Sequence, residues 1–98
     1  MPPRKDNQMA EIEAIPNPVP AGDSYTLEGC GYEMRPVEVW IDGEFSYAIG
    51  MRSTPDGACL DGNYWEIDVA GSYQIEILQQ REKGKKKDVV AAITLEVS

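Results

Sequence analysis

Histidine is absent from this chain of 98 residues, and its absence excludes several kinds of site at once. Serine–histidine and cysteine–histidine catalysis both require an imidazole, which is also the commonest zinc ligand. The remaining candidates for chemistry are aspartates, and Asp42, Asp56 and Asp61 each directly precede a glycine, which is ordinary turn sequence. The D-x-D-x-D-G spacing of a calcium loop does not occur either. We therefore expect a protein that is not an enzyme and that has no cofactor or metal site.

Basic residues and long apolar segments are also scarce. Seventeen acidic residues against nine basic ones give a net charge of −8, which is unsuited to binding the phosphates of nucleic acids. No apolar run approaches the roughly 18 residues that a membrane span needs, and residues 1–8 lack the apolar core of an export signal. We therefore expect no nucleic-acid partner, no membrane insertion, and synthesis in the cytoplasm.

Cysteine occurs only twice, at Cys30 and Cys59, which is too few for a small domain stapled by several disulfides. The two residues do not form a Cys-x-x-Cys motif, so a redox-active pair and a zinc knuckle are both excluded. Because no export signal is visible, reduced thiols are the default expectation. A bridge between Cys30 and Cys59 is the alternative.

Alternation of apolar and polar residues dominates the rest of the chain and predicts β-strands almost throughout. Turn-forming sequences separate the alternating segments, and Asp42-Gly43 is typical of a two-residue hairpin turn. About seven strands at this spacing predict an all-β sandwich of one domain, residues 9–98, preceded by a mobile arm, residues 1–8. The alternating segments are residues 9–15, 24–30, 36–41, 44–49, 63–68, 71–80 and 89–98.

The phase of the alternation predicts which side chains form the core. Phe45, Tyr47 and Ile49 share one side of their strand. Trp65 falls in phase with Ile67 and is expected to be buried. The predicted core consists of Trp65, Leu27, Val39, Tyr73, Ile75 and Ile93.

Two stretches carry a resemblance to a known family. They are Asp68-Val69-Ala70-Gly71-Ser72-Tyr73-Gln74-Ile75 and Tyr25-Thr26-Leu27-Glu28-Gly29-Cys30-Gly31-Tyr32, the latter after a proline turn. Together they resemble bacterial and phage immunoglobulin-like domains over residues 9–98. The resemblance implies an immunoglobulin-like, Greek-key β-sandwich in which Tyr73 hydrogen-bonds back to the chain upstream. It also implies that Leu27 and Ile75 replace the usual inter-sheet cysteines.

Trp40 falls in the outward phase together with Glu38, so it is a candidate anchor for a partner. The resemblance places Leu78 and Val90 of neighbouring strands on the same surface. Five of the nine basic residues crowd the turn from Arg81 to Lys87, which gives a second candidate contact at Lys85, Lys86 and Lys87. The alternatives are that the N-terminal arm or a long loop of the same chain covers Trp40, and that the basic turn is merely solvated.

The function expected from these features is that of a binding protein. The resemblance suggests a phage virion component, a decoration or accessory protein that is made in the host cytoplasm and docks on a capsid or tail protein. Self-association between copies of the chain is left open. The alternative is an adhesion or carbohydrate-binding module, in which Trp40 and Tyr64 stack on the sugar rings of surface glycans.

Overall fold

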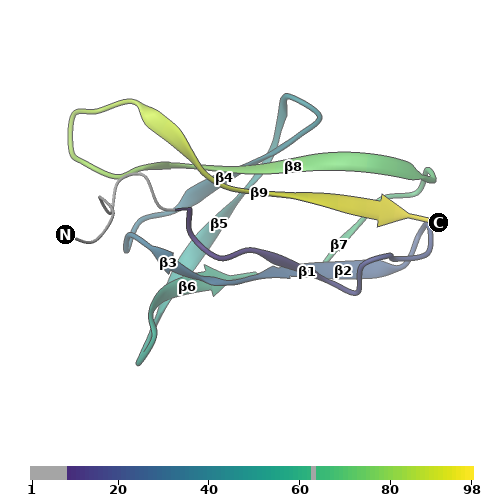
Figure 1. Ribbon diagram of the computed structural model, residues 1–98, viewed down its shortest axis with the longest axis horizontal. Helices are drawn as coiled ribbons and strands as arrows, with labels where there is room; N and C mark the ends of the chain where they lie inside the picture. The colour runs from purple at the N-terminus through teal and green to yellow at the C-terminus, as the bar shows by residue number, and fades with distance from the viewer. Residues whose placement is uncertain (1–8, 63) are drawn as a thin grey trace.

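The computed structural model describes residues 9–62 and 64–98, and within these residues the chain forms nine β-strands and no helix (Figure 1). The predicted arm, residues 1–8, lies outside the described residues. The part of the chain that is described contains no helix that is long and apolar enough to cross a membrane. The strands are β1 (Glu13–Ile15), β2 (Ser24–Glu28), β3 (Cys30–Tyr32), β4 (Val37–Ile41), β5 (Glu44–Thr54), β6 (Gly57–Asp61), β7 (Trp65–Glu66), β8 (Gly71–Gln80) and β9 (Lys87–Val97).

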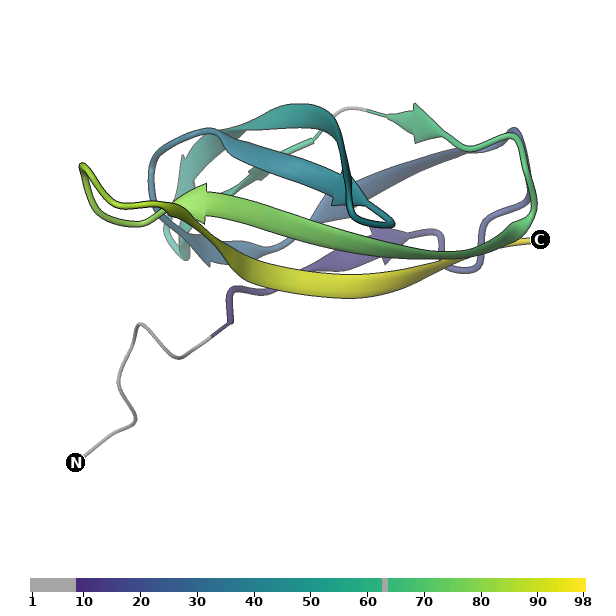
Figure 2. The same ribbon diagram turned by 90° about the horizontal axis from the view of Figure 1, so that it is seen from above.

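The strands form two antiparallel sheets, one of three strands in the order β1-β2-β7 and one of six in the order β3-β6-β5-β4-β8-β9. The two layers extend along the long axis of a molecule that measures 42 × 28 × 25 Å (Figure 1). Seen from above in Figure 2, β8 and β9 run side by side over nearly this whole length. The predicted all-β, sandwich-like architecture is thus confirmed. Nine strands replace the predicted seven because β3 and β6 were not recognised as separate strands.

Gly29 explains why the predicted strand over residues 24–30 is divided. The glycine has φ 148°, and a Cβ at this position would lie 2.1 Å from the carbonyl oxygen of Glu11. Only glycine fits such a close approach of two backbones. The chain therefore leaves the three-stranded sheet after β2 and enters the six-stranded sheet as β3.

The core agrees only in part with the predicted set. Leu27, Val39 and Ile75 are fully buried, as predicted. Tyr73, Trp65 and Ile93 are only partly buried and pack against the margin of the core. Trp65 lies on the two-residue strand β7, where its ring stacks on that of Tyr47 with 3.7 Å between the centroids.

The tyrosine interaction that the resemblance implies is present. The hydroxyl of Tyr73 donates a hydrogen bond of 2.6 Å to the carbonyl oxygen of Val69, four residues upstream. Leu27 and Ile75, which the resemblance places where other domains carry a disulfide, are both fully buried.

A disulfide is nevertheless present elsewhere, between Cys30 of β3 and Cys59 of β6. The default expectation of two reduced thiols is therefore wrong. The two residues are direct partners in the antiparallel pairing of β3 with β6, with 3.9 Å between their Cα atoms. The bridge links an edge strand of the six-stranded sheet to its neighbour.

The edge of the other terminal strand, β9, is covered by the segment between β1 and β2. Asn17 donates from its side-chain amide to the carbonyl oxygen of Thr94 and accepts from the amide of Glu96. Val19 continues the pairing, because its amide donates to Glu96 and its carbonyl oxygen accepts from Ser98. The side chain of Asn17 thus replaces a strand residue and satisfies edge groups that would otherwise attract another chain.

Candidate functional site

The outward side of β5, β4, β8 and β9 carries three of the candidate residues, Glu38, Trp40 and Leu78. Strand register places Ala48, Glu38, Leu78 and Val89 in one row across the sheet. A second row runs beside it through Phe45, Trp40, Glu76 and Ala92. We call these eight residues the outer face. It is apolar apart from two glutamates, and the opposite side of the same strands lines the core.

Val90 does not belong to the outer face, although it was predicted to. Its side chain is 1% exposed, whereas Val89 is 42% exposed. The reason is a β-bulge: Ile77 faces Ala91 and Leu78 faces Val89, so Val90 is the additional residue on β9. One inserted residue reverses the phase of the alternation, and Val89 takes the place beside Leu78.

Trp40 lies on the outer face in the outward phase, half-buried among its neighbours. Its indole N–H donates a hydrogen bond of 3.0 Å to a carboxylate oxygen of Glu38. The other carboxylate oxygen forms an ion pair with the ammonium group of Lys87. The hydrogen bond from Lys87, and then that from Trp40, lowers the pKa of Glu38. The polar atoms around the indole are therefore already paired within the chain.

Phe45 is a residue of the outer face that the sequence pattern misplaced. It was predicted to share a side with Tyr47 and Ile49, but it is 55% exposed and lies opposite Trp40. The register of β4 with β5 shifts between Val39 and Trp40, and this bulge turns Phe45 outward. The two rings meet edge to face with 6.3 Å between their centroids.

The turn between these strands was predicted correctly. Asp42 and Gly43 both have positive φ angles, 51° and 84°, as a two-residue hairpin turn of this kind requires. A carboxylate oxygen of Asp42 also accepts a hydrogen bond of 2.8 Å from the amide of Gln74. The turn that carries Phe45 is thereby fixed to β8.

A groove of about 370 Å³ borders the outer face, lined by Arg35, Pro36, Val37, Glu38, Ala48, Gln80 and Lys87. Its wall is positioned by Gln79, the one buried polar side chain of the described core, which is 1% exposed. The Gln79 amide group donates to the carbonyl oxygens of Glu33 and Arg35 and accepts from the amide of Glu33. The guanidinium of Arg35 donates in turn to the carbonyl oxygen of Gln80.

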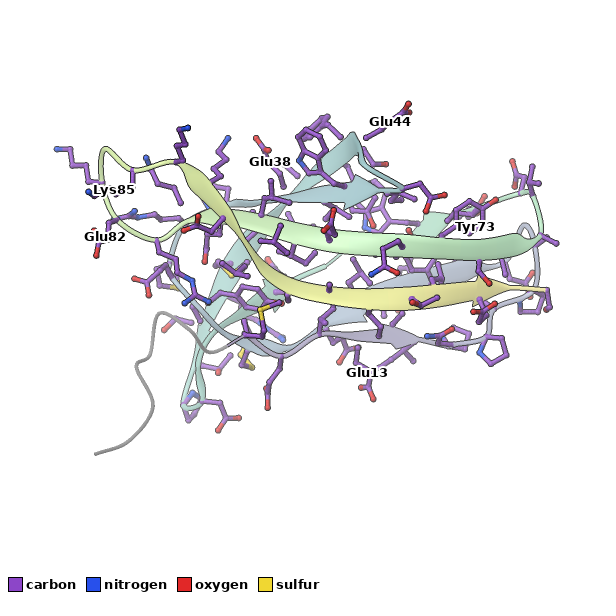
Figure 3. The ribbon with its side chains drawn as sticks, turned by 45° about the horizontal axis from the view of Figure 1, so that its top comes forward. Glu13, Glu38, Glu44, Tyr73, Glu82 and Lys85 are labelled. Atoms are coloured by element: carbon purple, nitrogen blue, oxygen red, sulfur yellow. A yellow bond between two sulfur atoms is a disulfide. The ribbon has the colours of Figure 1, made fainter. Side chains whose placement is uncertain are left out.

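The lysines of the β8–β9 turn do not form one site. Lys87 joins the outer face through its ion pair with Glu38. Lys85 and Lys86 are exposed in the turn beyond the ends of both strands, and Figure 3 shows Lys85 at the tip, beyond Glu38. The predicted contact at the three lysines is therefore divided between the outer face and the end of the molecule.

The aspartates are held in separate turns. Asp42 lies between β4 and β5, where its carboxylate accepts the bond from Gln74, whereas Asp56 lies between β5 and β6. Among residues 9–62 and 64–98, no three or more cysteine, aspartate or glutamate side chains are grouped so that they could hold a metal ion.

Comparison of the chain with models of protein families, with curated proteins and with solved structures finds no match in any of the three.

Proposed function

We propose that this protein is a non-enzymatic, immunoglobulin-like binding domain that docks on another protein through its outer face, with Trp40 as the anchor. The partner that we propose is a capsid or tail protein of a phage, which makes the chain a decoration or accessory component of the virion. Tryptophan is among the residue types that dominate the binding energy of protein interfaces.

The observation that carries the proposal is a group of four apolar side chains on one sheet face, of which two are exposed and two are partly buried. Phe45 and Val89 are 55% and 42% exposed, and Trp40 and Leu78 lie between them in the two rows. Scattered apolar exposure is normal, but a contiguous patch of this kind marks an interaction site. The patch continues along the groove, so a partner surface can contact both.

The pairing around Trp40 adds a reason why docking there is favourable. Burying a polar group without a partner costs about 1–3 kcal/mol. Because the indole N–H is bonded to Glu38, and Glu38 to Lys87, a partner can cover Trp40 without leaving these groups unpaired. Lys87 and Arg35 also line the groove, which favours a partner with acidic groups next to its apolar contact surface.

The assignment to a virion is supported by the sequence resemblance to phage immunoglobulin-like domains and by the disulfide. A bond such as Cys30–Cys59 persists in oxidising surroundings, and a particle outside its host is in such surroundings. Detection of the chain by mass spectrometry in gradient-purified particles is the expected result. Its absence from particles that are otherwise complete would count against the assignment.

The anchor is tested by Trp40→Ala. Truncating an anchor of this type costs on the order of 2–4 kcal/mol of binding, which is roughly a 30- to 1,000-fold loss of affinity for the particle. The melting temperature should stay close to that of the parent, because the indole faces away from the core. Tyr64→Ala is the matched control, since Tyr64 is 78% exposed and lies outside the outer face. Equal losses in both variants, or unfolding of the Trp40 variant, would overturn the assignment.

The alternative function is binding of surface glycans. It is favoured by the exposed aromatic rings, but Trp40 and Phe45 meet at 80° and so do not form one flat stacking surface. Tyr64 belongs to the connection that leads into β7 of the other sheet. A strong signal on a glycan array that is lost in Trp40→Ala would favour this function over protein docking.

A further inference from the structure

The described basic residues gather at one end of the long axis. The turn from Arg81 to Asp88 holds five basic and two acidic residues. Arg35 lies beside it, bonded to Gln80, and Arg52 lies near the β5–β6 turn at the same end (Figure 1). Three exposed lysines of the β8–β9 turn, Lys83, Lys85 and Lys86, project furthest and form what we call the lysine tip.

The opposite end is purely acidic among the described residues. Three connections meet there: Gly22 donates its amide to Ile67, Ser24 pairs with Glu66, and Gly71 pairs with Val97. Asp23, Glu66 and Asp68 carry exposed carboxylates at this place, and we call these three residues the acidic end. In Figure 3, Tyr73 marks this end and Lys85 the other.

We propose that copies of the chain associate end to end, with the lysine tip of one copy against the acidic end of the next. The two surfaces are complementary in charge and lie at opposite ends of a 42 Å axis. Such a contact is heterologous, so it builds rows or rings and not closed pairs. The lysine tip projects beyond the outer face, so a partner docked on Trp40 leaves it free.

Screening decides whether a chain of net charge −8 can attract itself. At physiological ionic strength the Debye length is about 8 Å, so charges further apart than this are largely screened. The centres of two copies placed end to end are separated by roughly the 42 Å length of one copy, whereas the facing tip and end are in contact. The local attraction therefore outweighs the repulsion between the net charges. Val69, 69% exposed beside Asp68, adds an apolar contact at the acidic end.

The test is the concentration dependence of self-association by analytical ultracentrifugation. We expect weak association at about 0.15 M salt. The association constant should fall roughly tenfold or more near 1 M salt, because the screening length falls to about 3 Å. A variant with Lys83→Glu, Lys85→Glu and Lys86→Glu should lose it. A variant with Asp23→Lys, Glu66→Lys and Asp68→Lys should also lose it. Melting temperatures near the parent's would show that both variants are folded.

Mixing the two variants is the decisive step. An acidic tip then meets a basic end, and a basic tip meets an acidic end, so association should return in the equimolar mixture. The control for general charge effects carries Glu13→Lys, Glu28→Lys and Glu44→Lys, with Asp23, Glu66 and Asp68 unchanged. Its net charge equals that of the variant with Asp23→Lys, Glu66→Lys and Asp68→Lys, which we call the basic-end variant. Because this control keeps both the lysine tip and the acidic end, it should associate by itself as the parent does, although its net charge is changed as much as that of the basic-end variant.

Three results would overturn the proposal: a parent that stays monomeric at millimolar concentration, association that either variant retains by itself, or loss of association in the control. Trp40→Ala should leave self-association unchanged. The outcome is therefore separate from that of the proposed docking, which depends on Trp40.

Discussion

The two sides of the strands β4 and β8 have the same alternating sequence pattern but opposite surroundings. On the inner side, Val37, Val39, Ile75 and Ile77 are at most 1% exposed and belong to the core cluster. On the outer side, Trp40 and Leu78 are only partly covered by their neighbours within the sheet. Adjacent residues of one strand therefore have different surroundings. Burial on the inner side stabilises the fold, whereas the outer side is the surface through which we propose that the protein docks.

This difference implies that stability and binding can be changed separately along one strand. A substitution on the inner side should act on the free energy of unfolding, and a substitution on the outer side should act on affinity. The predictions below, taken with the Trp40→Ala experiment, test whether the two sides are independent.

The largest effect is expected for Ile77→Ala on the inner side of β8. Removing a fully buried isoleucine side chain costs about 2–5 kcal/mol of unfolding free energy, because a cavity remains. Leu78→Ala, one residue further on the outer side, should cost less than about 1 kcal/mol. Urea denaturation of both variants checks the contrast, and similar losses would show that the outer face is part of the folding core.

A smaller effect is expected for Gln79→Leu. Gln79 is the buried polar side chain on the inner side of β8. The leucine leaves the amide and carbonyl of Glu33 and the carbonyl of Arg35 without their present partners, at a cost of about 1–3 kcal/mol. Faster hydrogen exchange at residues 33–35 should accompany the loss. Gln74→Leu is the control, because Gln74 is an exposed residue of β8. Its unfolding free energy should lie within about 0.5 kcal/mol of the parent's. An unchanged stability of the Gln79 variant would mean that water replaces the side chain.

The smallest effect concerns the pH response of the outer face. Hydrogen bonds from Lys87 and Trp40 lower the pKa of Glu38 in the folded protein. The stabilisation from this pairing is therefore fully present above the pKa that Glu38 has in the unfolded chain, and it is lost as the pH falls through the folded-state pKa. The indole N–H resonance of Trp40 should therefore shift at a pH below the ordinary range of glutamate. Because the pair is exposed, the change in stability should be slight. Lys87→Ala should move the midpoint upward, and a resonance insensitive to pH in both proteins would contradict the pairing.

The strand pattern and much of the inner side could be predicted from the sequence because alternation of period two reports burial directly. Leu27, Val39 and Ile75 are buried as expected, and Asp42-Gly43 forms the expected turn. These predictions depend only on residues close together in the chain.

The errors fall where one extra residue enters a strand. Phe45 and Val90 were both assigned to the wrong side, and each lies next to a bulge. A bulge is a property of the pairing between two strands, so the alternation of one strand does not show it. The pairing of Cys30 with Cys59 has the same origin, because it depends on the register of β3 against β6. For this reason the sequence pattern did not place Phe45 and Val89 on the outer face.

The disulfide also has a mechanical consequence. Cys30 and Cys59 are separated by 29 positions, and the loop that they close contains the whole of β4 and β5. When force is applied between residues 9 and 98, this loop cannot be drawn out, so the stretched chain is shorter by roughly 100 Å. Trp40 and Phe45 both lie inside the loop. A load carried through the chain therefore bypasses the hairpin that holds them, and the tension runs through the bond between the two sulfur atoms.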